Sequence, residues 1–279
     1  MTRYNRATGT LFVLSLLALF GASAQWSKTT ERQDVAVEMQ VALPRSVQVA
    51  VAGGDRHLAA NIAAIRALWV DTSKMQPEQF SVLARVQEDV AWLNAAHEDN
   101  YYAAAAILPW SGELDAAQRI LQAATLARRF DYQPPFYYAF NQLHFRHDPI
   151  GASRMLQDAA PFLPDPDEQL QMQNLAAIWL ERAEDPDLAI RVIESLAKQA
   201  TRRDFRKYLE MRAARLRSLQ GLQSASETYR KRFGRELQSL DSLVEAGLIS
   251  VLPADPFGFG YELAADGKVI LRNSPVRKK

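Results

Sequence analysis

The chain of 279 residues contains no cysteine, which excludes disulfide bonds, thiolate metal sites and cysteine nucleophiles. It also lacks an excess of charge, because 33 Lys and Arg face 32 Asp and Glu and leave a formal net charge of +1. General nucleic-acid binders usually carry a basic excess, so we expect no nucleic-acid partner. With 48% hydrophobic and 23% charged residues, the composition is that of a globular chain with a sizeable core.

Familiar catalytic motifs are also missing. The sequence has no G-x-S-x-G, no phosphate-binding loop and no HExxH. His144, His147 and Asp148 have a spacing that could hold a metal ion, but no further His or Cys completes the set. We interpret these three as solvated turn residues. The sequence therefore predicts no catalytic residues, no metal site, no cofactor and no enzyme activity.

A single long apolar run stands near the N-terminus, at residues 11–20, after Arg3 and Arg6. Ala22-Ser23-Ala24 follows and fits the small-x-small rule for signal cleavage, so residues 1–24 are a candidate signal peptide. The alternative is an uncleaved anchor, because residues 7–27 carry no charge and approach the ~20 residues that span a bilayer. A buried core helix is a third interpretation.

Both leading interpretations export the rest of the chain from the cytoplasm, and the basic start favours a cytoplasmic N-terminus. We therefore expect a periplasmic protein, either soluble or tethered to the inner membrane, with residues 25–43 as a linker. An exported chain without cysteine relies on its core for stability.

The apolar spacing is helical between residues 44 and 235, and Pro and Gly fall between the periodic stretches. One alanine-led pattern recurs at Ala117, Ala152 and Ala189, in steps of 35 and 37 residues. Aspartates stand just before or at the start of these segments, where each can cap a helix: Asp115, Asp148 and Asp185. The pattern predicts an all-α stack of antiparallel helix pairs in which the alanines let neighbouring helices approach closely.

These positions resemble the tetratricopeptide repeat (TPR), which has a small residue in its first helix and two alanines seven apart in its second. Ala105, Ala117 and Ala124 fit the first unit, whereas Phe140 and Leu196 replace small residues further along. The array is a degenerate one. The resemblance implies a right-handed superhelix. Residues 58–69 and 93–102 also look like the opening of exported or anchored bacterial repeat proteins.

The resemblance also implies a binding groove on the first helix of each pair. Tyr102, Tyr137 and Asn174 occupy the helix position that faces such a groove, and Asn141 and Ile178 take the next one. We expect these five residues to bind a protein or peptide partner. The alternative is that the aromatic rings simply pack between repeats.

The last part of the chain, residues 236–279, leaves the helical pattern. Residues 239–247 predict one short helix ended by glycine, and Asp266-Gly267 between short apolar runs predicts a β-hairpin. The string PADPFGFGYEL resembles the closing segment of type II secretion major pseudopilins, in which a related loop binds calcium. The N-terminal methylation segment of those proteins is missing here. We interpret the region as a small cap with a basic tail.

Taken together, these features predict a non-catalytic protein-protein interaction scaffold in the bacterial envelope. A fixed structural accessory subunit of a secretion, pilus or polysaccharide-export machine is the main alternative. A cell-wall enzyme on a helical scaffold is a third.

Overall fold

The computed structural model describes residues 15–16, 18–23, 25, 39, 41–183 and 185–272. Residues 1–14 and Ala24, on which much of the signal or anchor prediction depends, lie outside this part. None of the helices in the described ranges is long and apolar enough to cross a membrane.

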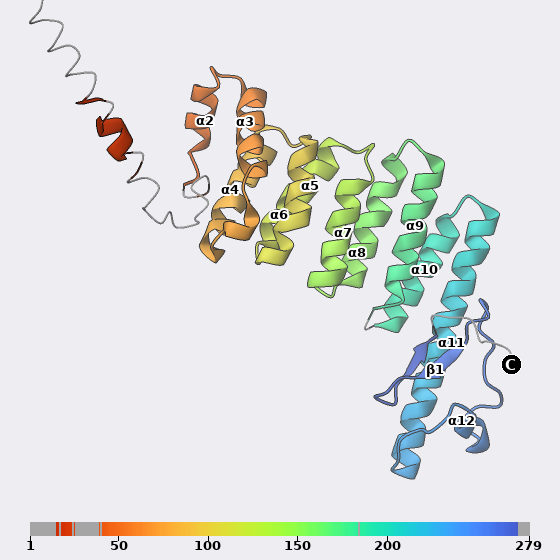
Figure 1. Cartoon of the computed structure of the whole chain (residues 1–279). Coiled ribbons are helices and arrows are strands. Elements are labelled where there is room, and N and C mark those ends of the chain that lie inside the picture. Colours follow the sequence, from red (N-terminus) through yellow and green to blue (C-terminus); the bar gives the residue numbers. More distant parts are fainter. Residues whose placement is uncertain are drawn as a thin grey trace, which may run out of the picture.

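The described chain is mostly helical and ends in a small two-stranded hairpin, as the sequence predicted (Figure 1). The helices are α2 (Arg45–Val51), α3 (Arg56–Leu68), α4 (Pro77–Leu93), α5 (Glu98–Ile107), α6 (Leu114–Ala127), α7 (Gln133–Phe145), α8 (Pro149–Ala159), α9 (Pro166–Leu180), α10 (Pro186–Gln199), α11 (Arg203–Phe233) and α12 (Asp241–Glu245). Short 3-10 turns lie at η2 (Thr72–Lys74), η3 (Pro109–Ser111) and η4 (Ala160–Phe162), and the strands are β1 (Tyr261–Leu263) and β2 (Val269–Leu271).

The helices lie side by side in chain order, in one elongated row that begins at α2 and ends at α11 (Figure 1). Each helix packs mainly against its neighbours in sequence, and short connections turn the chain back at each step. The α6, α8 and α10 helices begin at Leu114, Pro149 and Pro186, which repeats the 35- and 37-residue steps of the alanine pattern.

The predicted alanines lie in the core of the molecule. Ala117 and Ala152 are fully buried and Ala189 is 1% exposed. Leu108 and Leu180 are also fully buried beside them. Small side chains at these points let neighbouring helices come together, while the leucines fill the space around the contact.

Two of the three predicted helix caps are present. Asp148 accepts a hydrogen bond from the Gly151 N–H (2.8 Å) and Asp185 accepts one from the Leu188 N–H (2.9 Å). The prediction for Asp115 is wrong, because α6 begins at Leu114 and places Asp115 inside its first turn. There it forms an ion pair with Arg146. No proline follows Asp115 to fix the helix start one residue later, as proline does at α8 and α10.

The C-terminal residues form a cap on α11, a helix of 31 residues. The hairpin is antiparallel, with Tyr261 opposite Leu271 and Leu263 opposite Val269. Gly267 has a φ of 79° at the predicted turn, a value that glycine adopts without strain. Val269 is 1% exposed, so the hairpin shares a core with the last helices.

Candidate functional site

The histidine motif belongs to the turn between α7 and α8. The His144 ring stacks on Phe140 at 5.3 Å between centroids, and His147 occupies the turn with a φ of 52°. Asp148 is engaged in capping α8. In the part of the chain that the structure describes, no three His, Asp or Glu side chains gather as they would around a metal ion.

A row of aromatic rings connects α5, α7 and α9. Tyr101 stacks on Tyr102 (5.1 Å between ring centroids), and Tyr102 meets Tyr137 edge-on at 5.7 Å. Phe136 then contacts both Tyr137 (5.5 Å) and Trp179 (6.2 Å). Tyr102, at 37% exposed, is the most accessible of the five. The two tyrosines that the sequence predicted to share a groove are thus in direct contact.

The Tyr137 phenol stays neutral at physiological pH. Burial, and then the neighbouring Tyr102 phenol, raise the pKa of Tyr137 above its usual value near 10. A neutral phenol both donates and accepts hydrogen bonds. The Tyr102–Tyr137 pair therefore offers a partner apolar ring faces together with polar hydroxyl groups.

The buried end of the row is fixed by a polar cluster. The Tyr101 hydroxyl lies 2.8 Å from Asp131 and 3.2 Å from the Gln133 amide oxygen. Arg128 donates to Asp131 (2.9 Å) and to Glu98 (3.0 Å). These bonds connect the start of α5 with the α6–α7 turn, so they hold α5 and α7 in the orientation that brings their rings together.

Asn141 does not face a groove, and here the sequence prediction needs correction. Its side chain is 2% exposed, and its amide donates a hydrogen bond to the Gln118 oxygen (3.1 Å). Gln118 in turn donates to the Tyr138 carbonyl (3.2 Å). Asn141 lies one turn beyond Tyr137 on α7, but α6 covers its side chain. The hydrogen bond between Asn141 and Gln118 therefore connects α7 to α6.

The remaining two predicted residues lie between surface and core. Asn174 on α9 is half-buried, and its Oδ1 is shielded from solvent without a hydrogen-bond partner in the described ranges. Ile178 is half-buried against the cluster that contains Met172 and Trp179. Both side chains are therefore only partly accessible to a binding partner.

A cavity between α7 and α9 was not predicted from the sequence. Its volume is about 370 Å³, and its walls combine aromatic, aliphatic and acidic side chains: Tyr132, Phe136, Asp165, Glu168, Gln171, Met172 and Leu175. Asp165 also caps α9 through the Asp167 N–H (2.9 Å). Glu168 is half-buried and pairs with no cation in the described part of the chain. An unneutralised carboxylate beside aromatic rings attracts a cation.

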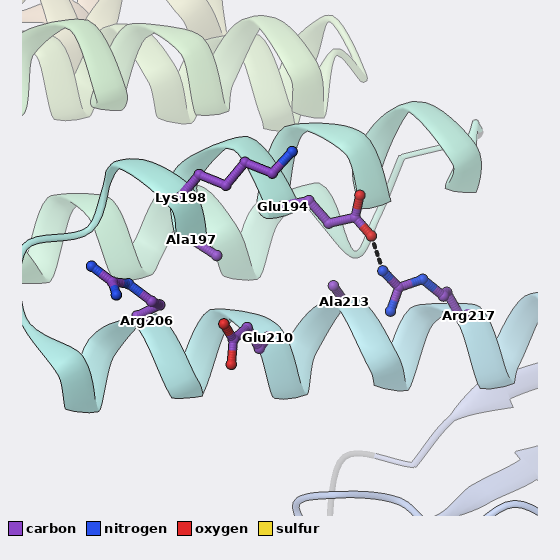
Figure 2. A pocket seen from close by; sticks show the side chains of 7 residues that line it. All are labelled: Glu194, Ala197, Lys198, Arg206, Glu210, Ala213 and Arg217. Carbon is purple, nitrogen blue, oxygen red and sulfur yellow. Dashed lines mark ion pairs between the residues drawn. The ribbon is translucent and has the colours of Figure 1, made fainter.

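A larger cavity of about 490 Å³ lies between α10 and α11, and Figure 2 shows its lining. The space exists because the two helices present small residues there, Ala197 and Ala213. Its charged walls include the Glu194–Arg217 ion pair drawn in Figure 2. Arg206 donates to the Ala200 carbonyl at 2.7 Å and so closes the end of α10. The walls of this cavity carry both positive and negative side chains, and they include no aromatic ring. The α10–α11 cavity therefore offers a ligand less selective contacts than the α7–α9 cavity does.

The aromatic row and the α7–α9 cavity share one residue, Phe136. We call this surface the α5–α9 face and define it by its accessible members: Tyr102, Tyr132, Phe136, Tyr137, Asp165, Glu168, Gln171 and Leu175. No protein-family model, no curated protein sequence and no solved structure matches the chain.

Proposed function

We propose that residues 44–235 form a degenerate TPR-like right-handed superhelix that binds a protein or peptide partner on the α5–α9 face. The observation that carries the proposal is the α7–α9 cavity, whose Phe136 ring also contacts Tyr137 of the Tyr102–Tyr137 pair. The regular helix starts and the buried alanines support the repeat architecture. The role is one of binding and not of catalysis.

The cavity favours a basic side chain from an extended partner segment. Met172 and Leu175 offer apolar contact to the aliphatic stem of Lys or Arg. Glu168 and Asp165 supply negative charge at the rim, and the Phe136 ring adds a cation–π surface. The hydroxyls of Tyr102 and Tyr137 are then available to the neighbouring backbone of the same segment.

The proposed compartment is the bacterial periplasm, with the protein soluble or held at the inner membrane by its N-terminal segment. The basic start and apolar run of that segment support this location. The alternative of a fixed accessory subunit predicts a stable complex that survives purification. The third alternative, a cell-wall enzyme, predicts peptidoglycan cleavage that one Glu→Gln substitution abolishes.

A site-specific photocrosslinker tests the face directly. Gln171 is exposed at the cavity, whereas Arg154 is exposed on α8 outside it, so the two positions form a matched pair. Benzoylphenylalanine at position 171 should capture a discrete partner in the native host, and the same group at position 154 should not. Capture of the same partner from both positions would contradict the assignment.

Substitutions on the face then measure its contribution. We expect Tyr102→Ala with Tyr137→Ala, or Glu168→Lys alone, to weaken binding of the captured partner at least tenfold while far-UV circular dichroism stays unchanged. Glu168→Gln should have an intermediate effect because it removes the charge but keeps the shape. If all three variants bound the partner with unchanged affinity, the binding site would lie on another part of the helical region and the assignment to the α5–α9 face would be wrong.

A further inference from the structure

A second cavity lies beside the start of α7, between α6 and α8, and we call it the α6–α8 cavity. Its volume is about 240 Å³, and apolar side chains form much of its wall: Leu126, Pro135, Met155, Ala159 and Phe162. Drug-sized ligands usually occupy pockets of about 300–1,000 Å³, so this smaller space suits a single large side chain.

The α6–α8 cavity and the α7–α9 cavity are lined by neighbouring residues of the same two segments. In the first turn of α7, Pro135 lines the α6–α8 cavity and Phe136 lines the α7–α9 cavity. Between α8 and α9, Phe162 lines the first cavity and Asp165 the second. The α6–α7 and α8–α9 connections lie at the same edge of the row (Figure 1). One bound segment that follows this edge can therefore reach both cavities.

The charges of the two cavities differ. Arg129 and Asp158 both line the α6–α8 cavity and offset one another, and its remaining acid, Asp131, is paired with Arg128 at 2.9 Å. The α7–α9 cavity contains two acids and no base among its lining residues. A cation is therefore attracted to the α7–α9 cavity, whereas the α6–α8 cavity favours an uncharged apolar group.

The rim of the α6–α8 cavity is apolar and accessible. Leu126 is 63% and Phe162 52% exposed, and the Arg129 guanidinium lies 4.5 Å from the centre of the Phe162 ring. Exposed apolar side chains grouped around a cavity are typical of binding sites. An aromatic or aliphatic side chain that enters this cavity covers both Leu126 and Phe162.

We infer that the partner segment carries a large apolar side chain that fills the α6–α8 cavity while its basic side chain occupies the α7–α9 cavity. The inference rests on the proposed function, because it assigns a second contact to the same partner. A buried apolar anchor commonly carries a large share of the binding energy of an interface. The α6–α8 cavity thus adds affinity and specificity to the attraction between opposite charges.

The positions of the two cavities also predict the spacing of the two side chains. The cavities flank the start of α7, and a helix with its side chains is about 10–12 Å wide. In the polyproline II conformation, side chains three positions apart point to the same side and lie about 9 Å from each other. The partner motif is therefore a basic residue and a large apolar residue that are three positions apart.

Selection from a library of short random peptides tests this motif, with the full chain in mild detergent as the bait. Enriched sequences should contain Lys or Arg together with a large apolar residue three positions away. Enrichment of basic residues without an apolar residue at a fixed distance would overturn this inference and leave the proposed function standing. Enrichment without basic residues, or no enrichment at all, would overturn both.

Two variants assign each side chain to its cavity. Leu126→Glu places a charge at the α6–α8 cavity, and the exposure of Leu126 makes a folding defect unexpected. The selection on Leu126→Glu should lose the apolar preference and keep the basic one, whereas the selection on Glu168→Lys should do the reverse. Ala127→Glu is the matched control, since Ala127 is exposed on α6 but does not line the cavity. An apolar preference that survives Leu126→Glu would overturn the inference.

Affinity measurements give the size of the effect. With the most enriched wild-type peptide as the probe, fluorescence polarisation should show at least tenfold weaker binding to Leu126→Glu and less than a twofold change for Ala127→Glu. Equal affinities of the two variants would contradict the role of the cavity. Sedimentation of the wild-type chain without peptide tests a second copy as the occupant. A dimer that Leu126→Glu dissociates would overturn the inference in favour of self-association.

Discussion

Arg215 on α11 and Asp255 in the C-terminal cap form an ion pair at 3.1 Å, with only 7% and 1% of their side chains exposed. Asp255 also accepts hydrogen bonds from the backbone N–H groups of Phe257 (3.0 Å) and Gly260 (2.7 Å). The Nη2 group of the same guanidinium donates to the Arg272 carbonyl at 2.9 Å. The cap is thus folded around a side chain that lies 40 residues earlier in the sequence.

The segment DPFGFG, which the sequence analysis compared with pseudopilins, therefore makes contacts within the protein itself. The rings of Phe257 and Phe259 lie 5.7 and 5.5 Å from the Arg215 guanidinium. Arg212 lies 5.5 Å from the Phe257 ring and pairs with Glu181 at the end of α9. Both oxygens of the Asp255 carboxylate already accept hydrogen bonds, so the string is organised for attachment of the cap to α11.

The first prediction concerns this ion pair. Asp255→Ala leaves a buried guanidinium without its main counter-charge, and such losses cost about 3–5 kcal/mol. We expect a value near the lower end, because Glu181 lies 3.9 Å from Arg215 and retains part of the compensation. Urea denaturation measures the loss, and limited proteolysis should show the cap released first.

The control for this prediction is the double replacement Arg215→Met with Asp255→Leu. Removing both charges together should cost less than Asp255→Ala alone, because no charge stays buried without a partner. Equal stability of wild type and Asp255→Ala would contradict the structural role of the pair.

The second prediction concerns the Tyr101 hydroxyl and its pH dependence. Burial, and then the hydrogen bond to Asp131, raise the pKa of Tyr101 far above its usual value. The folded state therefore favours the neutral phenol, so this contribution to stability is fully present below the unfolded pKa of about 10 and is lost as pH rises above it.

Tyr101→Phe should cost about 1–2 kcal/mol at pH 8, because the buried hydroxyl bond to Asp131 is lost. Between pH 8 and pH 11 the stability of the variant should fall less steeply than that of the wild type. Urea midpoints across this range measure both effects. Parallel pH profiles for the two proteins would show that the hydroxyl is not coupled to folding.

The third prediction compares two aspartates with similar positions in the sequence pattern. Asp148 caps α8, and Asp148→Ala should cost about 1 kcal/mol. Asp115 forms an exposed ion pair with Arg146, with 76% of the Asp115 side chain accessible, so Asp115→Ala should cost well below 1 kcal/mol. Thermal unfolding of the two variants side by side distinguishes them, and a larger loss for Asp115→Ala would contradict the assigned helix start.

The fourth prediction concerns the alanine contacts between helices. Ala152 on α8 is fully buried, so Ala152→Leu must push neighbouring helices apart and should cost about 1–3 kcal/mol or more. Arg154 lies on the same helix but is exposed, so Arg154→Leu adds the same side chain without a steric conflict. Hydrogen exchange should show faster opening of α7 and α8 only in the first variant. Similar exchange in both would argue against a close helix contact at Ala152.

Features that depend on neighbouring residues could be predicted from the sequence. The helical stretches, the hairpin at Asp266-Gly267 and the caps at Asp148 and Asp185 follow from periodicity, turn chemistry and capping preference. The 35-residue spacing predicted equivalent helix positions for Tyr102 and Tyr137 but not the contact between their rings, which lie 5.7 Å apart between centroids.

Features that depend on which surface is covered could not be predicted. Asn141 shares a helix with Tyr137, but only the position of α6 decides that Asn141 is buried. The cavity lined by Phe136 and Glu168 exists because α7 and α9 are separated there by a particular distance, which no local pattern specifies.

The sequence by itself thus determined the helical stretches and the location of the C-terminal hairpin, because these arise from short-range backbone and side-chain preferences. Only the tertiary structure decided that Arg215 and Asp255 meet, that Leu58, Ile62 and Ile65 on α3 remain exposed, and that a cavity opens between α7 and α9. The physical reason is that burial and pairing between distant residues depend on how whole helices pack, and the free energy of that packing is shared by many contacts at once.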